Sequence, residues 1–186
     1  MSNPARFDPL GSGAPFSFAN KLERAVWQAA WLLLARWTPP PLFRWRAALL
    51  RLFGARIGRD ARIYGSVRVW LPRDLIVGDG VIVGPKAILY NQGRITIGPR
   101  AVISQGAHLC ASSHDVRDPS FALTLRPIHV GEACWVAADA FVGPNVTMQP
   151  GAVLGARGAL FEDAEGFGIY CGNPARLIGR REWRED

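Results

Sequence analysis

The sequence predicts an all-β protein, a solenoid of short parallel β-strands that follows a short N-terminal segment of two helices. Three observations support this prediction. An aliphatic residue recurs every six residues through most of the chain after residue 55, and Gly or Ala often follows it. Two stretches rich in Trp and Arg precede the first repeat. A repeat of fixed period indicates stacked units, each of which buries its aliphatic residues against the next.

Length and charge fit one main domain. The chain has 186 residues, of which 49% are hydrophobic, so it can bury a sizeable core. Its formal charge is +7, and residues 1–62 account for all of it, with ten Lys and Arg against three Asp and Glu. Residues 63–186 carry twelve of each sign. We therefore expect a neutral body and no nucleic-acid partner.

The first 54 residues contain a leader and two helices. Residues 1–20 are rich in Pro, Gly, Ser and Asn without periodicity, so we expect a flexible leader. Residues 21–54 form an amphipathic helical segment. Its uncharged stretch, residues 25–35, has about half of the ~20 residues that a helix needs to cross a bilayer. Three prolines at 39–41 end the first helix, and Gly54 is expected to end the second.

The second helix places large apolar side chains on one side and two arginines, Arg44 and Arg51, on the other. The apolar set is Leu42, Trp45, Leu49, Leu52 and Phe53. Two compatible interpretations remain open for the whole segment. Either it lies on a membrane surface, with Trp at the headgroups and Arg facing anionic lipid, or its aromatic residues pack against the body or a neighbouring subunit.

A six-residue period with one inward aliphatic residue in each step requires a corner at every step, because a flat strand would send every second residue to the same face. Three steps close one triangular coil, and stacked coils pair strand on strand at ~4.8 Å. The small residue after each aliphatic residue allows the tight corner. The inward positions are Ile57, Ile63, Val69, Val77, Val83, Leu89, Ile97, Ile103, Leu109, Val130, Val136, Val142, Met148, Leu154 and Leu160.

One loop interrupts the repeat. An insertion between Leu109 and Val130 places His114 beside two acids, Asp115 and Asp118. A loop of this length costs a solenoid little chain entropy and is usually functional.

Four motifs accompany the repeats: WTPPPLFRWRAALLRLFGARIG, SHDVRDPSF, CWVAADAFVGPNVT and CGNPAR. Over residues 55–178 the chain resembles the hexapeptide-repeat acyltransferases, and more locally the acetyltransferases of exopolysaccharide biosynthesis of the colanic-acid type. The resemblance implies a left-handed parallel β-helix, whereas parallel crossovers are otherwise right-handed. It also implies a homotrimer with three sites, each between two subunits. Residues 179–186 are then a charged C-terminal tail.

The resemblance further implies an acetyl-CoA-dependent O-acetyltransferase that acts on a sugar hydroxyl in surface-polysaccharide biosynthesis, with acetyl-CoA as co-substrate and no metal. Such a transfer needs a base for the hydroxyl proton, a donor for the tetrahedral oxyanion and a groove for the pantetheine arm. His114 aligns with the family's catalytic histidine and is the expected base. Asp115, Asp118 or a backbone carbonyl is expected to orient its ring.

Residues on both sides of the loop supply the expected oxyanion donor and acceptor contacts. The donor is a backbone N–H near Ala137 and Ala138. Trp135 is expected to line the acceptor pocket, although corner packing would explain this residue equally well. Asn91, at a coil boundary, and Asp118 are the other expected acceptor contacts.

The acetyl-CoA channel is expected along the later coils, where small residues let the arm approach the backbone. Arg176 and Arg180, with Arg181, are expected to meet the nucleotide phosphates, and a merely solvated basic tail is the alternative. Arg157 is expected to replace a phosphate-binding lysine of the wider family, because Glu162 occupies that position. The small residues of the channel are Ala137, Gly143, Gly155 and Ala156.

Two other protein classes stay open. The same fold carries carbonic anhydrases with zinc on three histidines, and this chain has His108, His114 and His129, whose spacing disfavours a preformed site. A non-catalytic trimeric scaffold is the second. Three widely spaced cysteines without a CxxC pair fit a reducing compartment. We therefore expect a cytoplasmic protein, held at the inner face of the cytoplasmic membrane through residues 21–54 and acting on a lipid-linked acceptor.

Overall fold

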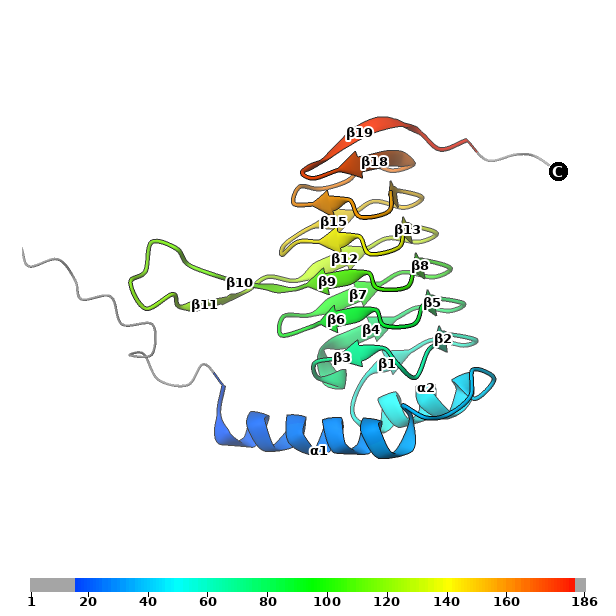
Figure 1. Cartoon of the computed structure of the whole chain (residues 1–186), viewed down its shortest axis with the longest axis vertical. Coiled ribbons are helices and arrows are strands. Elements are labelled where there is room, and N and C mark those ends of the chain that lie inside the picture. The colour runs from blue at the N-terminus through cyan, green and yellow to red at the C-terminus, as the bar shows by residue number, and fades with distance from the viewer. Residues whose placement is uncertain (1–15, 183–186) are drawn as a thin grey trace, which may run out of the picture.

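The computed structural model describes residues 16–182 and shows two helices beneath a tall stack of short strands (Figure 1). Helix α1 (Phe18–Leu34) begins at Ser17, whose Oγ accepts a hydrogen bond from the Asn20 N–H at 3.2 Å. Helix α2 (Phe43–Leu52) follows the proline cluster and ends before Gly54, which has a positive φ of 92°. These helices form the base on which the first coil rests.

The strands form five full coils of three and a final hairpin. The first three coils are β1 (Arg56–Ile57), β2 (Arg62–Ile63), β3 (Arg68–Val69); β4 (Leu75–Val77), β5 (Ile82–Val83), β6 (Ile88–Tyr90); and β7 (Ile95–Ile97), β8 (Val102–Ile103), β9 (His108–Cys110). A hairpin of β10 (Ser112–His114) and β11 (Leu123–Leu125) comes next. The remaining strands are β12 (Ile128–Val130), β13 (Trp135–Val136), β14 (Phe141–Val142); β15 (Thr147–Met148), β16 (Val153–Leu154), β17 (Ala159–Leu160); and β18 (Gly168–Gly172) with β19 (Ala175–Arg180).

Equivalent strands of successive coils pair in parallel and build three sheets. Sheet A has the order β1-β4-β7-β12-β15, sheet B the order β2-β5-β8-β13-β16-β18-β19 and sheet C the order β3-β6-β9-β14-β17. Within sheet B only β18 and β19 pair antiparallel. We call the line of corners from sheet B to sheet C the B–C edge, and the line from sheet C to sheet A the C–A edge.

The inward positions predicted from the repeat all lie in the core, and none of their side chains is more than 8% exposed. The small residue that follows permits close stacking of coils: a Cβ on Gly78 would lie 2.6 Å from the Pro99 nitrogen of the next coil. The tight corner itself lies two residues further on, where residues such as Asp60 and Lys86 adopt φ values of 54° and 62°. The corner therefore depends on left-handed backbone more than on the small residue to which the sequence analysis assigned it.

Helix α1 caps the first coil through two buried tryptophans. The Trp27 Nε1–H donates to the Val69 carbonyl at 2.9 Å, and the Trp31 Nε1–H donates to the carbonyls of Gly65 and Val67, both at 3.1 Å. Because the first coil has no coil beneath it, its carbonyls would otherwise lack partners. The second interpretation of the aromatic residues, packing against the body, is therefore correct for Trp27 and Trp31.

Helix α2 caps the same coil with a fully buried arginine. The guanidinium of Arg46 donates to the carbonyls of Ile63 and Pro40, both at 2.6 Å, and to Thr38 Oγ1 at 2.7 Å. Burial lowers the pKa of this guanidinium, which still stays protonated at neutral pH. Arg51, on the same helix, donates to the Ile57 carbonyl at 2.8 and 2.9 Å.

The buried face of α2 matches the apolar set of the hydrophobic pattern only in part. Leu49 is buried and Phe53 packs against the core, but Leu42, Trp45 and Leu52 are exposed, and Arg46, Ala47 and Leu50 are buried. The pattern did not place Arg46 on the buried face, because it ranks faces by hydrophobicity alone. The carbonyls of the first coil have no strand beneath them to donate hydrogen bonds. The face of α2 that carries a donor, Arg46, therefore packs against them.

The fold class predicted from the sequence, a left-handed parallel β-helix with two N-terminal helices, is confirmed. Helix α1 begins inside the stretch assigned to the leader, and β19 continues to Arg180, inside the stretch assigned to the tail. The rest of the predicted leader, residues 1–15, and of the tail, residues 183–186, lies outside the described residues. Neither described helix is long and apolar enough to span a bilayer.

The cap supplied by Arg46 yields a stability prediction. Arg46→Met should lower the free energy of unfolding by about 3 kcal/mol, because it leaves several buried carbonyls without donors. Urea denaturation followed by circular dichroism measures this change. The matched control is Arg44→Met in the same helix, where the side chain is exposed and a change within about 0.5 kcal/mol is expected. Equal stability of the two variants would contradict the capping role.

Candidate active site

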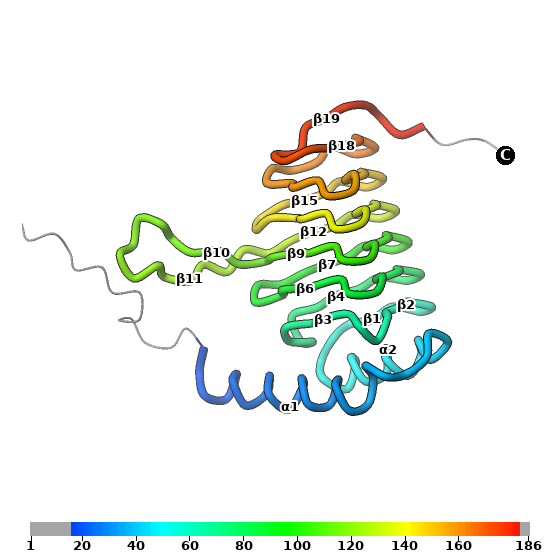
Figure 2. The backbone as a smooth tube through the Cα atoms, viewed as in Figure 1, coloured from blue at the N-terminus to red at the C-terminus, as the bar shows by residue number. Residues whose placement is uncertain are grey.

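The insertion between β9 and β12 is an antiparallel hairpin that projects from the solenoid at the C–A edge (Figure 2). Strands β10 and β11 pair with the register Ser112 to Leu125 and His114 to Leu123. The hairpin is anchored where the Arg126 N–H donates to the Ala111 carbonyl at 3.0 Å. It therefore holds His114 away from the coils while its base is fixed to them.

The His114 ring is oriented by a backbone carbonyl. Its Nδ1 lies 2.5 Å from the carbonyl oxygen of Phe121, a residue with a φ of 49° on the far side of the hairpin turn. A carbonyl oxygen only accepts, so Nδ1 carries a proton, and in the neutral ring the lone pair is then on Nε2. The exposed imidazole can thus accept a proton at Nε2.

The two acids of the hairpin organise its turn. Asp115 Oδ1 accepts from the Arg117 N–H at 2.9 Å. Asp118 Oδ1 accepts from both the N–H and the Oγ of Ser120 at 2.8 Å, and these bonds, the backbone one first, lower the pKa of Asp118. Of the three orienting groups left open by the sequence, the carbonyl is the one in contact with the His114 ring.

A cavity of about 360 Å³ opens beside His114. Its walls come from both hairpin strands and from Pro144, on the next corner of the C–A edge. Two cations, Arg117 and Arg126, and the carboxylate of Asp115 line it. The cavity is large enough for one sugar ring and offers polar groups on several sides.

The other predicted catalytic group lies on the B–C edge. The Ala137 N–H already donates to the Leu154 carbonyl at 2.9 Å and belongs to the coil-to-coil ladder. Ala138, the next residue, is at the corner, half-buried, and its N–H makes none of the hydrogen bonds recorded among residues 16–182. Of the two predicted oxyanion donors, Ala138 is therefore the one with a free N–H.

Several predicted cofactor residues stack on that same corner. Gly155, Ala156 and Arg157 occupy the B–C edge one coil above, where the Arg157 N–H donates to the Ala138 carbonyl at 2.9 Å. Trp135 lies at the start of this region in β13. The residue is 46% exposed, and its Nε1–H donates to Ser104 Oγ at 2.9 Å. Both expected roles of Trp135, pocket wall and packing, remain compatible with this position.

Two predicted site residues lie elsewhere. Gly143 is on the C–A edge, next to Pro144 of the His114 cavity, and so is not aligned with Gly155. Asn91 is fully buried: its Oδ1 accepts from the Trp70 N–H at 2.9 Å and its Nδ2 donates to the Leu71 carbonyl at 2.6 Å. The expected contact between Asn91 and the acceptor is therefore wrong, because the buried amide of Asn91 joins two coils.

The predicted phosphate-binding arginines lie near the C-terminal end of the solenoid. Three of them contact carboxylates, and the fourth, Arg181, contacts a backbone carbonyl. Arg176 lies 3.9 Å from Glu162, and Arg157 lies 4.0 Å from Asp139. Arg180 pairs with Glu165 at 2.6 Å, and the Arg181 guanidinium donates to the Ala133 carbonyl at 2.9 Å. Exposed ion pairs of this kind contribute little and can exchange for a phosphate.

Comparison with known proteins identifies the family. The colanic acid biosynthesis acetyltransferase WcaF of Escherichia coli is 42% identical over 176 residues, which cover 94% of this chain and 97% of WcaF. The chain belongs to the WcaF family of acetyltransferases. No model of a protein family matches the sequence.

Solved structures of other acetyltransferases share the fold. A maltose O-acetyltransferase from Clostridium difficile aligns with a TM-score of 0.80 at 18% identity, over 90% of each chain. A hexapeptide-repeat acetyltransferase from Vibrio cholerae, solved with acetyl coenzyme A, aligns with a TM-score of 0.81 at 17% identity, over 91% of this chain and 92% of that one. The β-helix of this acetyltransferase is therefore a shared architecture.

The three histidines of this acetyltransferase lie on different elements, β9, β10 and β12. Across residues 16–182 no cluster of three or more His, Cys, Asp or Glu side chains is placed to hold a metal ion.

His108 belongs to a column of rings on the outer face of sheet C. Burial, and to a smaller extent the charge of Arg68, lowers the pKa of His108. The column is Trp70, Tyr90, His108, Phe141 and Phe161.

The sequence analysis missed this column, although its signal was present. Each ring stands one residue before or after an inward aliphatic residue, so its side chain points outward. Equivalent outward positions of successive coils lie one above another. A comparison of equivalent outward positions would have shown the aromatic residues aligned.

The contact of His114 with Phe121 predicts the behaviour of Asp115. Asp115→Asn should lower the turnover number for acetyl transfer by less than ~10-fold, because the carbonyl and not the carboxylate orients the ring. Steady-state kinetics measure this change. A loss equal to that of a His114 variant would show that Asp115 acts directly on the imidazole.

Proposed function

We propose that this acetyltransferase transfers an acetyl group from acetyl-CoA to a saccharide hydroxyl in surface-polysaccharide biosynthesis, with His114 as the general base. The observation that carries the proposal is the imidazole held at Nδ1 by the Phe121 carbonyl, in a histidine that lines a sugar-sized cavity. The relationship to WcaF supports the polysaccharide, and the acetyl coenzyme A complex of the Vibrio cholerae protein supports the donor.

The proposed reaction is a direct transfer. His114 Nε2 removes the proton of the acceptor hydroxyl as the oxygen attacks the thioester carbonyl. The C=O π bond opens, and the tetrahedral oxyanion accepts a hydrogen bond from the Ala138 N–H. When the intermediate collapses, the C–S bond breaks and the coenzyme A thiolate leaves. The proton on Nε2 returns to that sulfur, so the base is regenerated.

The acetyltransferase is proposed to work as a homotrimer, because one chain holds its two half-sites on different edges. His114 belongs to the C–A edge, whereas Ala138, Gly155 and Ala156 belong to the B–C edge. A cyclic trimer joins two different surface patches at every interface. The projecting hairpin of one copy can then meet the B–C edge of the next copy and complete the site.

In that arrangement the donor lies along the B–C edge. Ala137, Gly155 and Ala156 leave room for the pantetheine arm, and Arg157, Arg176 and Arg180 bind the phosphates of the nucleotide. The acceptor occupies the hairpin cavity that Asp115 lines, with Asp118 holding the adjoining turn and Trp135 of the neighbouring copy as a further wall. Gly143 borders the same cavity through Pro144 and contributes on the acceptor side.

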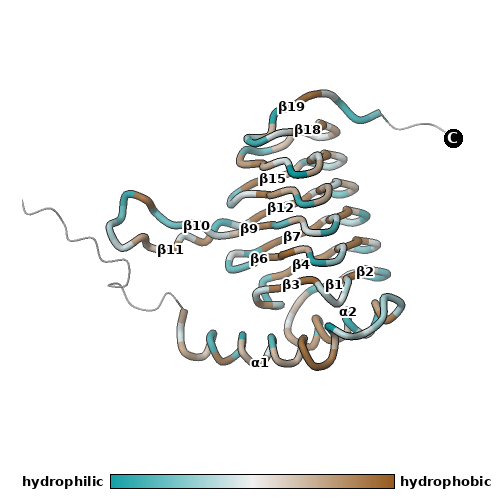
Figure 3. The backbone as a smooth tube through the Cα atoms, in the orientation of Figure 1, coloured by the Kyte–Doolittle hydropathy of each residue, from teal (hydrophilic) through white to brown (hydrophobic). Residues whose placement is uncertain are grey.

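The outer face of α1 is proposed to contact the cytoplasmic membrane, where a lipid-linked acceptor would be found. Figure 3 shows hydrophobic stretches along this helix, which is amphipathic by sequence. Although Trp27 and Trp31 face the first coil, other large apolar side chains of the segment remain exposed. In α1 and the turn after it these are Phe18, Leu22, Val26, Leu32, Leu33, Leu34 and Trp37, with the exposed cations Lys21 and Arg36 among them. Apolar anchors flanked by cations suit an anionic membrane surface.

The role of His114 predicts a large and selective loss. His114→Ala should lower turnover by about 10²–10⁴, because the hydroxyl proton loses its acceptor, while acetyl-CoA still raises the melting temperature. Turnover is measured by release of free thiol. The matched control is His129→Ala, an exposed histidine on β12 outside the hairpin, for which near-normal turnover is expected.

Two results would contradict this proposal. Near-normal turnover in His114→Ala would remove the histidine from the chemistry. If acetyl-CoA did not stabilise the wild-type protein against heat, acetyl-CoA would not be the acetyl donor.

A further inference from the structure

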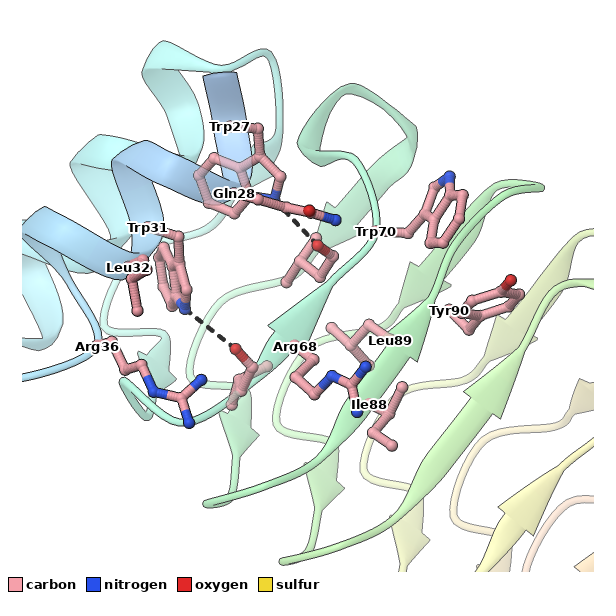
Figure 4. A pocket seen from close by; sticks show the side chains of 12 residues that line it. Trp27, Gln28, Trp31, Leu32, Arg36, Arg68, Trp70, Ile88, Leu89 and Tyr90 are labelled. Atoms are coloured by element: carbon pink, nitrogen blue, oxygen red, sulfur yellow. Dashed lines mark hydrogen bonds between the residues drawn. The ribbon is translucent and has the colours of Figure 1, made fainter. Parts of the chain in front are cut away.

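A groove separates α1 from the outer face of the first two coils (Figure 4). Its volume is about 340 Å³. Gln28 and Leu32, four residues apart on one face of α1, line it from the helix side, and Arg36 lines it from the turn after the helix. Arg68 and Ile88 of sheet C line the opposite wall.

The groove combines an apolar floor with two cations. Leu32 and Ile88 contribute hydrocarbon, while Arg36 and Arg68 both contribute exposed guanidinium groups. No acidic side chain lines it, and across residues 16–182 neither guanidinium is recorded in an ion pair or a hydrogen bond. Both guanidinium groups are therefore available to an anion that enters the groove.

The groove is continuous with the exposed apolar face of α1. Leu32 lines the groove from α1, and Arg36 lines it from the turn that follows the helix. Leu33 and Trp37, which stand next to these two residues in the sequence, are exposed apolar side chains outside the groove lining. A molecule that extends from the groove over these side chains meets hydrocarbon on one side and guanidinium groups on the other.

We propose that this groove binds the terminal phosphate of a membrane lipid, a phosphomonoester or diphosphate headgroup, between Arg36 and Arg68. Two planar guanidinium groups match a phosphate dianion, each through paired N–H donors. The acyl or isoprenoid chain of such a lipid would leave along the apolar face of α1. The proposal rests on the membrane contact given under Proposed function, but it is independent of the chemistry at His114.

Vesicle flotation of the full-length protein tests the proposal. The vesicles consist of phosphatidylcholine with either phosphatidic acid, a phosphomonoester, or phosphatidylglycerol, a phosphodiester, added to equal total negative charge. The wild-type protein should bind the phosphatidic acid vesicles about tenfold more tightly. The double variant Arg36→Gln, Arg68→Gln should lose this preference.

A double variant of equal charge serves as the control. Arg44→Gln, Arg62→Gln removes two exposed cations, one from α2 and one from β2, where Arg62 occupies the same repeat position that Arg68 occupies in β3. This variant should retain the preference for phosphatidic acid. Urea denaturation should give the same midpoint for both variants and the wild type, because all four side chains are exposed.

Four outcomes would overturn the proposal, and the first three are these. The wild type binds the two kinds of vesicle equally; the control variant loses as much preference as the groove variant; or the groove variant keeps the vesicle preference while inorganic phosphate stabilises the wild type thermally through Arg36 and Arg68, which would assign the groove to a soluble phosphate. Absence of any vesicle binding, with acetyl transfer intact, would remove the membrane contact and this site together. Absence of acetyl transfer would contradict the proposed reaction only, because vesicle binding tests the groove separately.

Discussion

The structure depends on backbone hydrogen bonds between successive coils. Most strands have only two or three residues, too short to persist alone, and each is paired on both sides by the equivalent strands of its neighbours. This arrangement leaves a problem only at the two ends of the stack. At the lower end, Arg46, Arg51, Trp27 and Trp31 supply the donors that a missing coil would have supplied. At the upper end, β19 closes sheet B by folding back on β18.

A capped solenoid provides rigid, straight edges from which the chain can build a site. The hairpin leaves at one corner without disturbing the register, since β12 pairs with β7 as if the insertion were absent. Small residues on the B–C edge keep that side open for an extended ligand. His114 and the B–C edge residues therefore have fixed positions on different edges of one chain, and the proposed trimer is the arrangement that would unite them.

The repeat made the solenoid, its inward residues and the place of the insertion predictable, because a six-residue period leaves few alternatives. The orientation of His114 was not predictable, since it depends on the left-handed turn at Phe121, which no local pattern marks. Asn91 was assigned to the acceptor because it stands at a coil boundary. The polarity of a side chain there does not show whether it is buried between coils or exposed to a ligand. Similarly, the buried face of α2 follows from unpaired carbonyls on another element, and hydrophobic periodicity contains no information about them.

The central claim is that each catalytic site combines His114 of one copy with the B–C edge of another, and co-expression of two inactive variants tests it most directly. One variant is His114→Ala, and the other is Ala156→Trp, which fills the proposed channel at an exposed corner. In mixed trimers formed at random from equal amounts, about a quarter of the interfaces pair an intact histidine with an intact channel, so about a quarter of the wild-type activity should return. Activity no higher than that of the separate variants, in trimers shown to be mixed, would contradict the account.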